Sequence, residues 1–142
     1  MTLASQTTLA VPGASISGEG YLPGVCNIGP DEIARRRRAG HVGLGSAIVL
    51  LGGLVVVGAP PPLRLLVALP AAVAASGYLQ ARLRFCAGFG SRGIYNFGEL
   101  GQSLPVEDTD ARRRDRVRAT QIGLASGAIG VAVGLVAVGL PR

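Results

Sequence analysis

The sequence predicts an all-α integral membrane protein with three transmembrane helices and a cytoplasmic cap rich in Gly and aromatic residues. Three observations support this fold class. Hydrophobic residues make up 49% of the 142 residues and charged residues only 15%, whereas ordinary soluble domains carry about 25% charged residues. Three long stretches contain no Asp, Glu, Lys or Arg, and arginines flank them. A soluble chain this apolar would lack the polar surface needed to cover itself.

Residues 30–59 are predicted as one helix that enters the membrane and forms span 1 near residues 42–59. Pro30 suits the first helical position, where its missing N–H has no intrahelical partner to lose. Asp31 and Glu32 follow in the first turn, where the helix dipole favours negative charge. A helix of this length is about 45 Å long, so its first turns extend beyond a hydrocarbon core of about 30 Å.

Residues 1–29 are predicted to form a cytoplasmic N-terminal segment without a signal peptide. The first basic residue of the chain is Arg35, so the charged region that begins a signal peptide is missing. The apolar run near the start is short, and Pro12 interrupts it.

The remaining segments follow from the charge-free stretches. Consecutive prolines end the first helix and predict a short extracytoplasmic turn over residues 60–63. A chain that has crossed the bilayer once must return, so residues 64–81 are predicted as span 2. Residues 82–118 are predicted as a cytoplasmic loop containing Cys, Gly and Arg, and residues 119–142 as span 3 with a short tail. Spans 1 and 3 reach the roughly 20 residues that a crossing needs, and span 2 falls just short.

The arginines predict the orientation, because cytoplasmic ends of membrane proteins carry an excess of basic residues. All 14 basic residues are arginines, and only Arg64 and Arg142 fall on the side of the short turn and the C-terminus. The others precede span 1 or lie between spans 2 and 3. We therefore expect a multi-pass protein of the inner or plasma membrane, with its N-terminus inside and its C-terminus outside.

Four consecutive arginines, Arg35, Arg36, Arg37 and Arg38, precede the charge-free part of span 1. Successive side chains on a helix point about 100° apart, so this run forms a collar around the helix rather than a stripe. A collar suits the anionic headgroups of a lipid bilayer, whereas a helix that reads DNA would concentrate its arginines on one face. We expect contact with anionic headgroups and no nucleic-acid partner.

Glycines in span 3 predict close helix packing. Gly123, Gly127, Gly130 and Gly134 recur at steps of four, three and four, which aligns them along one helix face. Small residues let membrane helices approach closely, and lipid removes the usual hydrophobic drive for association. We therefore expect a homo-oligomer or a subunit of a larger membrane complex. The similar strings AGHVGLGS in span 1 and ATQIGLAS in span 3 also raise the hypothesis of an internal repeat.

The two cysteines and the single histidine are candidate site residues. Cys26 and Cys86 both fall on the predicted cytoplasmic side, near arginines, and basic surroundings favour thiolate chemistry. Together with His41 they offer at most three ligands to a metal, and neither the metal nor another cofactor is predicted. The alternatives are structural packing of the thiols, a redox pair, and lipidation.

A glycine-rich string in the predicted loop, Gly88 to Gly93, matches the dinucleotide-binding pattern GxGxxG. That pattern needs a strand before it and a helix after it, and here an apolar span precedes it, so a dinucleotide site is not expected. Consecutive glycine amides can instead form an anion-binding nest. On this hypothesis Gly88, Gly90 and Gly93 would supply amides and Arg92 a guanidinium.

These features favour a non-enzymatic function. The charge-free stretches of the spans contain no Asp, Glu, Lys or Arg to form a proton or ion path. No paired carboxylates, nucleophile with a base, or Walker motif is recognisable. The first hypothesis is a small accessory, scaffold or assembly subunit that packs through glycine-lined helix faces and docks through its cap. The alternative is a thiol-based metal, redox or anion site at the cytoplasmic membrane face. An oligomeric channel is a third hypothesis.

Overall fold

The structure is a computed structural model that describes residues 20–141. Its elements are α1 (Pro30–Val56), a 3-10 helix η1 (Pro61–Val67), α2 (Ala68–Leu83), α3 (Ala87–Arg92), β1 (Ile94–Tyr95), β2 (Leu104–Pro105) and α4 (Thr109–Gly139). The prediction of a mostly helical chain is confirmed. Within the described residues, three helical segments are long and apolar enough to cross a membrane: Pro30–Val56, Pro61–Leu83 and Thr109–Gly139.

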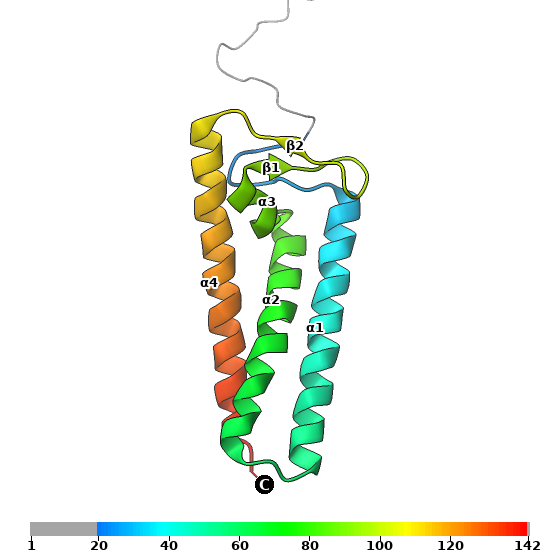
Figure 1. Ribbon diagram of the computed structural model, residues 1–142, viewed down its shortest axis with the longest axis vertical. Coiled ribbons are helices and arrows are strands. Elements are labelled where there is room, and N and C mark those ends of the chain that lie inside the picture. The colour runs from blue at the N-terminus through cyan, green and yellow to red at the C-terminus, as the bar shows by residue number, and fades with distance from the viewer. Residues whose placement is uncertain (1–19, 142) are drawn as a thin grey trace, which may run out of the picture.

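The three long helices run side by side, with α2 between α1 and α4 (Figure 1). Glycines allow the α1–α2 contact. A Cβ atom on Gly77 of α2 would lie 2.7 Å from the carbonyl oxygen of Arg36 and 2.7 Å from the Cα of Gly40. One on Gly43 would lie 2.5 Å from the backbone nitrogen of Ala74. Carbon atoms pack best at about 3.5–4.0 Å, so these helices are closer than any side chain at the crossing would allow.

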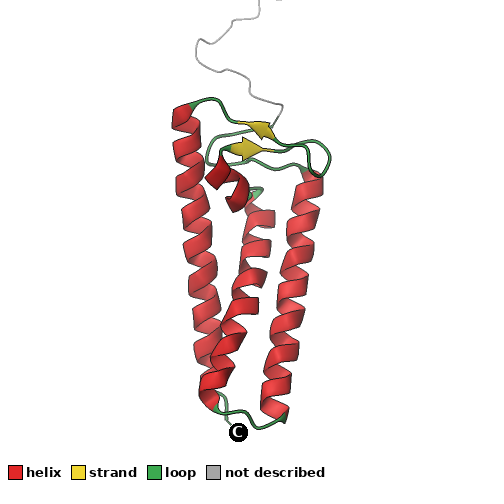
Figure 2. Ribbon diagram, viewed as in Figure 1, coloured by secondary structure: helices red, strands yellow, loops and turns green. Residues whose placement is uncertain are grey.

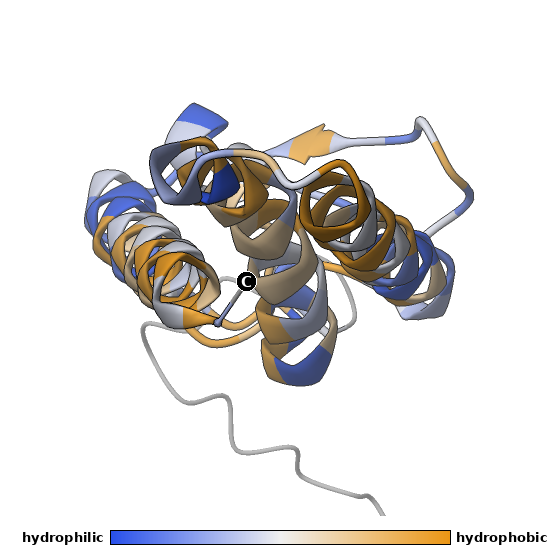
Figure 3. Ribbon diagram, turned by 90° about the horizontal axis from the view of Figure 1, so that it is seen from below, coloured by the Kyte–Doolittle hydropathy of each residue, from blue (hydrophilic) through white to orange (hydrophobic). Residues whose placement is uncertain are grey.

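Each of the three long helical segments contains a long hydrophobic stretch (Figure 3). Large aliphatic side chains on the surfaces of these helices are mostly exposed, among them Val49 at 75%, Val56 at 86%, Leu69 at 70% and Leu124 at 71%. In water such a surface would be an extended aggregation site. Lipid tails remove that cost, so the arrangement suits a bilayer.

A cap, formed by residues 20–29 and 84–108, lies at one end of the three helices (Figure 2). In it, β1 pairs antiparallel with β2, and Ile28 makes an isolated parallel bridge with Asn96. The sequence prediction of an all-α chain left out this ladder. Two-residue strands are too short to produce the alternating pattern that identifies a strand.

Aromatic side chains fill the interior of the cap. Tyr21 stacks on Tyr95 with ring centroids 4.8 Å apart, and Phe97 packs against Tyr95 at 6.2 Å. Phe85 is completely buried at the junction with the helices, where it contacts Ala119 of α4 and its neighbours. Burial of these rings supplies apolar contact that a segment so rich in glycine would otherwise lack.

The helix bounds differ from the predicted spans for local reasons. The first helix ends at Val56 because Gly58 adopts a left-handed conformation with φ of 66° and prolines follow. The last helix begins at Thr109, inside the predicted loop 82–118, because the Asp108 side chain accepts hydrogen bonds from the first amides of α4. The arginine run of that region is therefore helical. Residues 1–19 of the predicted N-terminal segment and Arg142 of the predicted tail lie outside the described residues.

Candidate functional site

The junction between the cap and the helices is built around Asn27. Its side chain is fully buried and pairs with the backbone of Cys86 in both directions. The Nδ2 atom donates to the Cys86 carbonyl at 3.1 Å, and the Cys86 amide donates to Oδ1 at 2.6 Å. A carboxamide carries the same donor and acceptor as a peptide group. The Asn27 side chain therefore joins the segment that contains Cys26 to the segment that contains Cys86, through the same pair of hydrogen bonds that a backbone peptide group would make.

Cys86 is a structural thiol at the start of α3. Its Sγ atom accepts hydrogen bonds from Nη2 of Arg36 at 3.0 Å and from the Phe89 amide at 3.4 Å. The side chain is the N-cap of this short helix, and only 2% of the residue is exposed. A ligand has no access to a thiol in this position unless the cap opens.

Arg36 points inward rather than toward a bilayer surface. Its guanidinium lies 3.4 Å from the carboxylate of Glu32, which is buried in the first turn of α1. It also lies 5.8 Å from the ring centroid of Phe89, within the range of a cation–π interaction. The four arginines therefore do not form the predicted collar together, because Arg36 packs inside the junction between the cap and the helices.

The other three arginines of the run are exposed. Arg35 pairs with Glu32 at 3.5 Å while 58% of its side chain stays exposed, and such surface pairs contribute little. Arg37 lines a hollow that Cys26 also lines. These three remain suited to headgroup contact.

Cys26 lies in a different environment from Cys86. It is partly exposed, and its Sγ atom is 3.9 Å from the Ile28 carbonyl oxygen. It lines a hollow of about 700 Å³ between the cap and the ends of α1 and α2. Arg37, Arg82 and Arg84 contribute basic side chains to the same hollow. The hollow thus combines an accessible thiol with positive charge.

The three predicted metal ligands do not form one site. Among residues 20–141, no group of three or more His, Cys, Asp or Glu side chains lies close enough to hold a metal ion, and both cysteines are free. His41 contacts Tyr78 of α2, with Nδ1 2.7 Å from the phenol oxygen and the rings edge to face. The histidine therefore links α1 to α2 within the helical part of the protein.

The backbone amides of the predicted anion nest take part in the hydrogen bonds of a short helix. Gly88, Gly90 and Arg92 belong to α3, and Gly93 ends it with a left-handed φ of 69°. The Gly90 amide donates to the Cys86 carbonyl at 2.9 Å, and the Gly93 amide donates to Gly90 at 3.4 Å. Amides already used within the chain leave little to offer an anion. Arg92 and Gly88 are exposed on the outer side of this turn.

The predicted glycine stripe of α4 divides into two halves. A Cβ on Gly130 would lie 2.6 Å from the Ala68 carbonyl oxygen, and one on Gly134 would lie 2.9 Å from the Ala68 Cβ, so these two contact α2. For Gly123 and Gly127, such a Cβ would have no described atom within 4 Å beyond the adjacent residues and backbone of α4 itself. At the level of Gly123 and Gly127 the buried residues of α4 are Ile122 and Ser126, so these two glycines lie beside the packed face and not on it.

Other glycines matter more to the α1–α2 contact than the sequence predicts. Gly40 and Gly43 of α1 face α2, and Ala47 continues the same buried face. Their steps of three and four residues were a recognisable signal. Further glycines follow in the same span, at 45, 52 and 53, so spacing alone did not identify which of them face α2.

Asp115 is a buried carboxylate that fixes the start of the cap. It accepts hydrogen bonds from the Tyr21 hydroxyl at 2.8 Å and from the Gly24 amide at 2.7 Å. Burial, and after it the hydrogen bond to this carboxylate, raises the pKa of Tyr21 above its ordinary range. The sequence contains no signal for these two partners, which lie 94 and 91 residues away.

At the opposite end of the helices, Arg64 is buried. Only 1% of the residue is exposed, and its Nη1 atom donates to the Leu140 carbonyl at 2.9 Å, where α4 ends. A cation at a helix C-terminus opposes the negative end of the dipole and satisfies a free carbonyl. Arg64 therefore closes the end of α4 rather than meeting solvent.

Comparison with protein-family models, with curated proteins and with solved structures found no match to this chain. The function is accordingly inferred from the contacts and charges described above.

Proposed function

We propose that this protein is a non-enzymatic scaffold or assembly subunit of the inner or plasma membrane. In this proposal the three apolar helices anchor the chain, and the cap presents a fixed surface to a partner. Buried polar contacts support the idea of a fixed surface. Asn27 and Asp115 hold the cap on the helices, and neither side chain is reachable by solvent.

The observation that carries the proposal is the set of glycines left open on the outer helix faces. A Cβ atom on Gly123 or Gly127 of α4, or on Gly45 or Gly52 of α1, would meet no described atom within 4 Å beyond the adjacent residues and backbone of its own helix. The glycines that face α2 account for packing inside the chain. In lipid, open small-residue faces are where a second helix packs most closely.

Native mass spectrometry and chemical cross-linking in mild detergent test this proposal. A wild-type oligomer, or a stable complex with another membrane protein, is expected. Gly127→Ile should weaken that association, because a branched side chain separates the two backbones. Ala125→Ile is the matched control, since Ala125 is also exposed but lies on the opposite side of α4. A strictly monomeric wild type without any partner would contradict the proposal.

We further propose that the cap is cytoplasmic and the C-terminus extracytoplasmic. Arg64, at the end opposite the cap, supports this orientation because its charge is buried at the end of α4. Most exposed guanidinium groups then belong to the cap end, as cytoplasmic surfaces require. Reporter fusions at the C-terminus test it, with alkaline phosphatase active and a fluorescent protein dark. The reverse result would overturn the orientation.

A second candidate function is a thiol or anion site in the hollow that contains Cys26. The accessible thiol next to Arg37, Arg82 and Arg84 favours it. On this candidate, a negatively charged thiol reagent modifies Cys26 faster than a neutral reagent of equal intrinsic reactivity, and Cys86 stays unmodified. Metal analysis and redox titration of Cys26→Ser and Cys86→Ser complete the test. Behaviour equal to wild type in both variants would exclude the candidate.

A further inference from the structure

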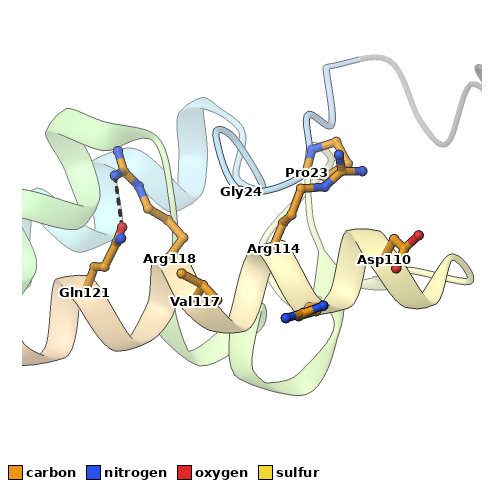
Figure 4. Close-up of a pocket in the computed structure, with 8 residues that line it drawn as sticks. Pro23, Gly24, Asp110, Arg114, Val117, Arg118 and Gln121 are labelled. Atoms are coloured by element: carbon orange, nitrogen blue, oxygen red, sulfur yellow. Dashed lines mark hydrogen bonds between the residues drawn. The ribbon is translucent and has the colours of Figure 1, made fainter.

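A pocket of about 530 Å³ lies between the turn at Pro23–Gly24 and α4 (Figure 4). Its main lining residues are Gly24, Arg113, Arg114, Val117, Arg118 and Gln121. The spacing of the helical members places them on one face of α4, beside the face that packs on the cap. Three of them are arginines, so the pocket is strongly basic.

The wall opposite α4 is held in place. Gly24 donates its amide to the buried carboxylate of Asp115 at 2.7 Å, and Tyr21 donates to the same carboxylate at 2.8 Å. The turn adopts a left-handed φ of 73° at Gly24, and a Cβ there would lie 3.3 Å from the Cβ of Arg114. Contact this close sets the width of the pocket. The pocket is therefore a built feature of the fold and not a gap between loose segments.

No arginine of the pocket forms an ion pair within residues 20–141, where the ion pairs are those that Glu32 makes with Arg35 and Arg36. Arg118 makes one long hydrogen bond, 3.4 Å to Oε1 of Gln121, and its Nε atom is buried without a described partner.

Asp110 is the carboxylate that lines the pocket. It lies two turns along α4 from Arg118, about 12 Å at the helical rise, and Figure 4 shows its side chain pointing away from Arg118. The part of the pocket between Arg114 and Gln121 is thus available to an anion.

Apolar side chains border the same pocket. Val117 lies between two of the arginines and is 53% exposed, and the turn that forms the wall exposes Leu22 at 57% and Val25 at 58%. Beyond Gln121, α4 contains no charged residue until it ends at Gly139. The pocket is therefore at the level where the helix changes from charged to apolar, which is where a lipid headgroup would lie.

We propose that this pocket binds a phosphate-bearing anion through Arg114 and Arg118, with Arg113 adding charge at the rim. Guanidinium groups form paired hydrogen bonds with phosphate oxygens. Two sources share this chemistry, the headgroup of an anionic phospholipid and a free phosphate. The inference rests on the proposed membrane placement, and is independent of the scaffold role and of the orientation.

Native mass spectrometry of the full chain in nanodiscs provides the test. Nanodiscs of phosphatidylcholine with added phosphatidylglycerol test the lipid source, and inorganic phosphate in pure phosphatidylcholine discs tests the free anion. The pocket variant is R114Q with R118Q. The control variant is R92Q with R116Q, which removes the same charge from exposed positions outside the pocket and outside the arginine run of α1.

The pocket variant should retain phosphatidylglycerol at least about tenfold less than wild type, as loss of charge-assisted hydrogen bonds implies. The control variant should change by less than about twofold, since it loses only screened surface charge. Binding of inorganic phosphate that the pocket variant abolishes would assign the free anion as the source. Equal losses in both variants, or no binding of either ligand by wild type, would overturn the proposal. Melting temperatures verify folding, and oligomers seen in the same spectra keep this result separate from the scaffold proposal.

Discussion

Replacement of Gly77 by Ala should force α1 and α2 apart. The new methyl group would lie 2.7 Å from the carbonyl oxygen of Arg36 and from the Cα of Gly40. Both atoms belong to the backbone of α1, so no side chain can rotate away. Restoring a normal contact requires a separation of about 1 Å, given optimal carbon distances of about 3.5–4.0 Å. Overpacking of this kind costs about 1–3 kcal/mol, and we expect a loss of stability in that range.

The buried thiol of Cys86 provides the assay. Only 2% of this residue is exposed in the folded protein, so a maleimide dye reports unfolding when it reacts there. In a Cys26→Ser background, Cys86 is the single thiol of the chain. Labelling is followed against temperature, or against the fraction of denaturing detergent. The Gly77→Ala variant should reach half-labelling under milder conditions than the Cys26→Ser parent.

Gly45→Ala is the matched control. A Cβ at Gly45 would meet no described atom within 4 Å beyond the adjacent residues and backbone of α1 itself, and Ala is about 1 kcal/mol better than Gly in a helix interior. The control should be neutral or slightly stabilising. If Gly77→Ala were as stable as Gly45→Ala, the close approach of α1 and α2 at this crossing would be refuted.

Three further predictions concern buried polar contacts. Tyr21→Phe should cost about 1.5–3 kcal/mol, the range for a hydrogen bond to a charged group. Folding raises the pKa of Tyr21, so the stabilisation that protonated Tyr21 provides is fully present below its unfolded pKa of about 10. This stabilisation is lost as pH rises toward and through the folded pKa. Denaturation measured at pH 8 and pH 11 should therefore show a loss of stability in wild type that the Tyr21→Phe variant lacks. Arg64→Met should lower the free energy of unfolding by about 1–3 kcal/mol and speed amide hydrogen exchange in the last turn of α4. Unchanged exchange there would contradict the hydrogen bond from Arg64 to the Leu140 carbonyl. Asn27→Ala should leave the amide of Cys86 unpaired, while its carbonyl keeps the bond from the Gly90 amide. The expected cost is about 1–3 kcal/mol for the buried amide, and dye labelling of the Cys86 thiol should rise under native conditions. Labelling equal to wild type would argue against the role of Asn27 in holding the two segments together.

The start of each long helix was predictable from neighbouring residues to differing degrees. Pro30 with Asp31 and Glu32 identified the start of α1, and α1 begins at Pro30. The start of α4 had an equally local signal in Asp108, which caps the helix, but the arginine run that follows favoured interpretation as a loop. A run of arginines is compatible with either a loop or a helix, whereas an N-cap residue such as Asp108 specifically indicates a helix start.

The candidate site was less predictable because its contacts join distant segments. Arg36 and Arg37 are neighbours in one run, yet Arg36 turns toward Cys86 and Arg37 lines the hollow beside Cys26. No property of the run distinguishes them. Their roles depend on where α3 and the cap lie against α1.

The sequence alone determined that three segments of this chain are long and apolar enough to cross a bilayer, since length and polarity add up residue by residue along one helix. Only the tertiary structure decided which glycines touch another helix, which arginine is buried and which thiol is accessible. Those outcomes depend on how two helices cross and on the shape of both partners, so one residue's identity and spacing cannot specify them.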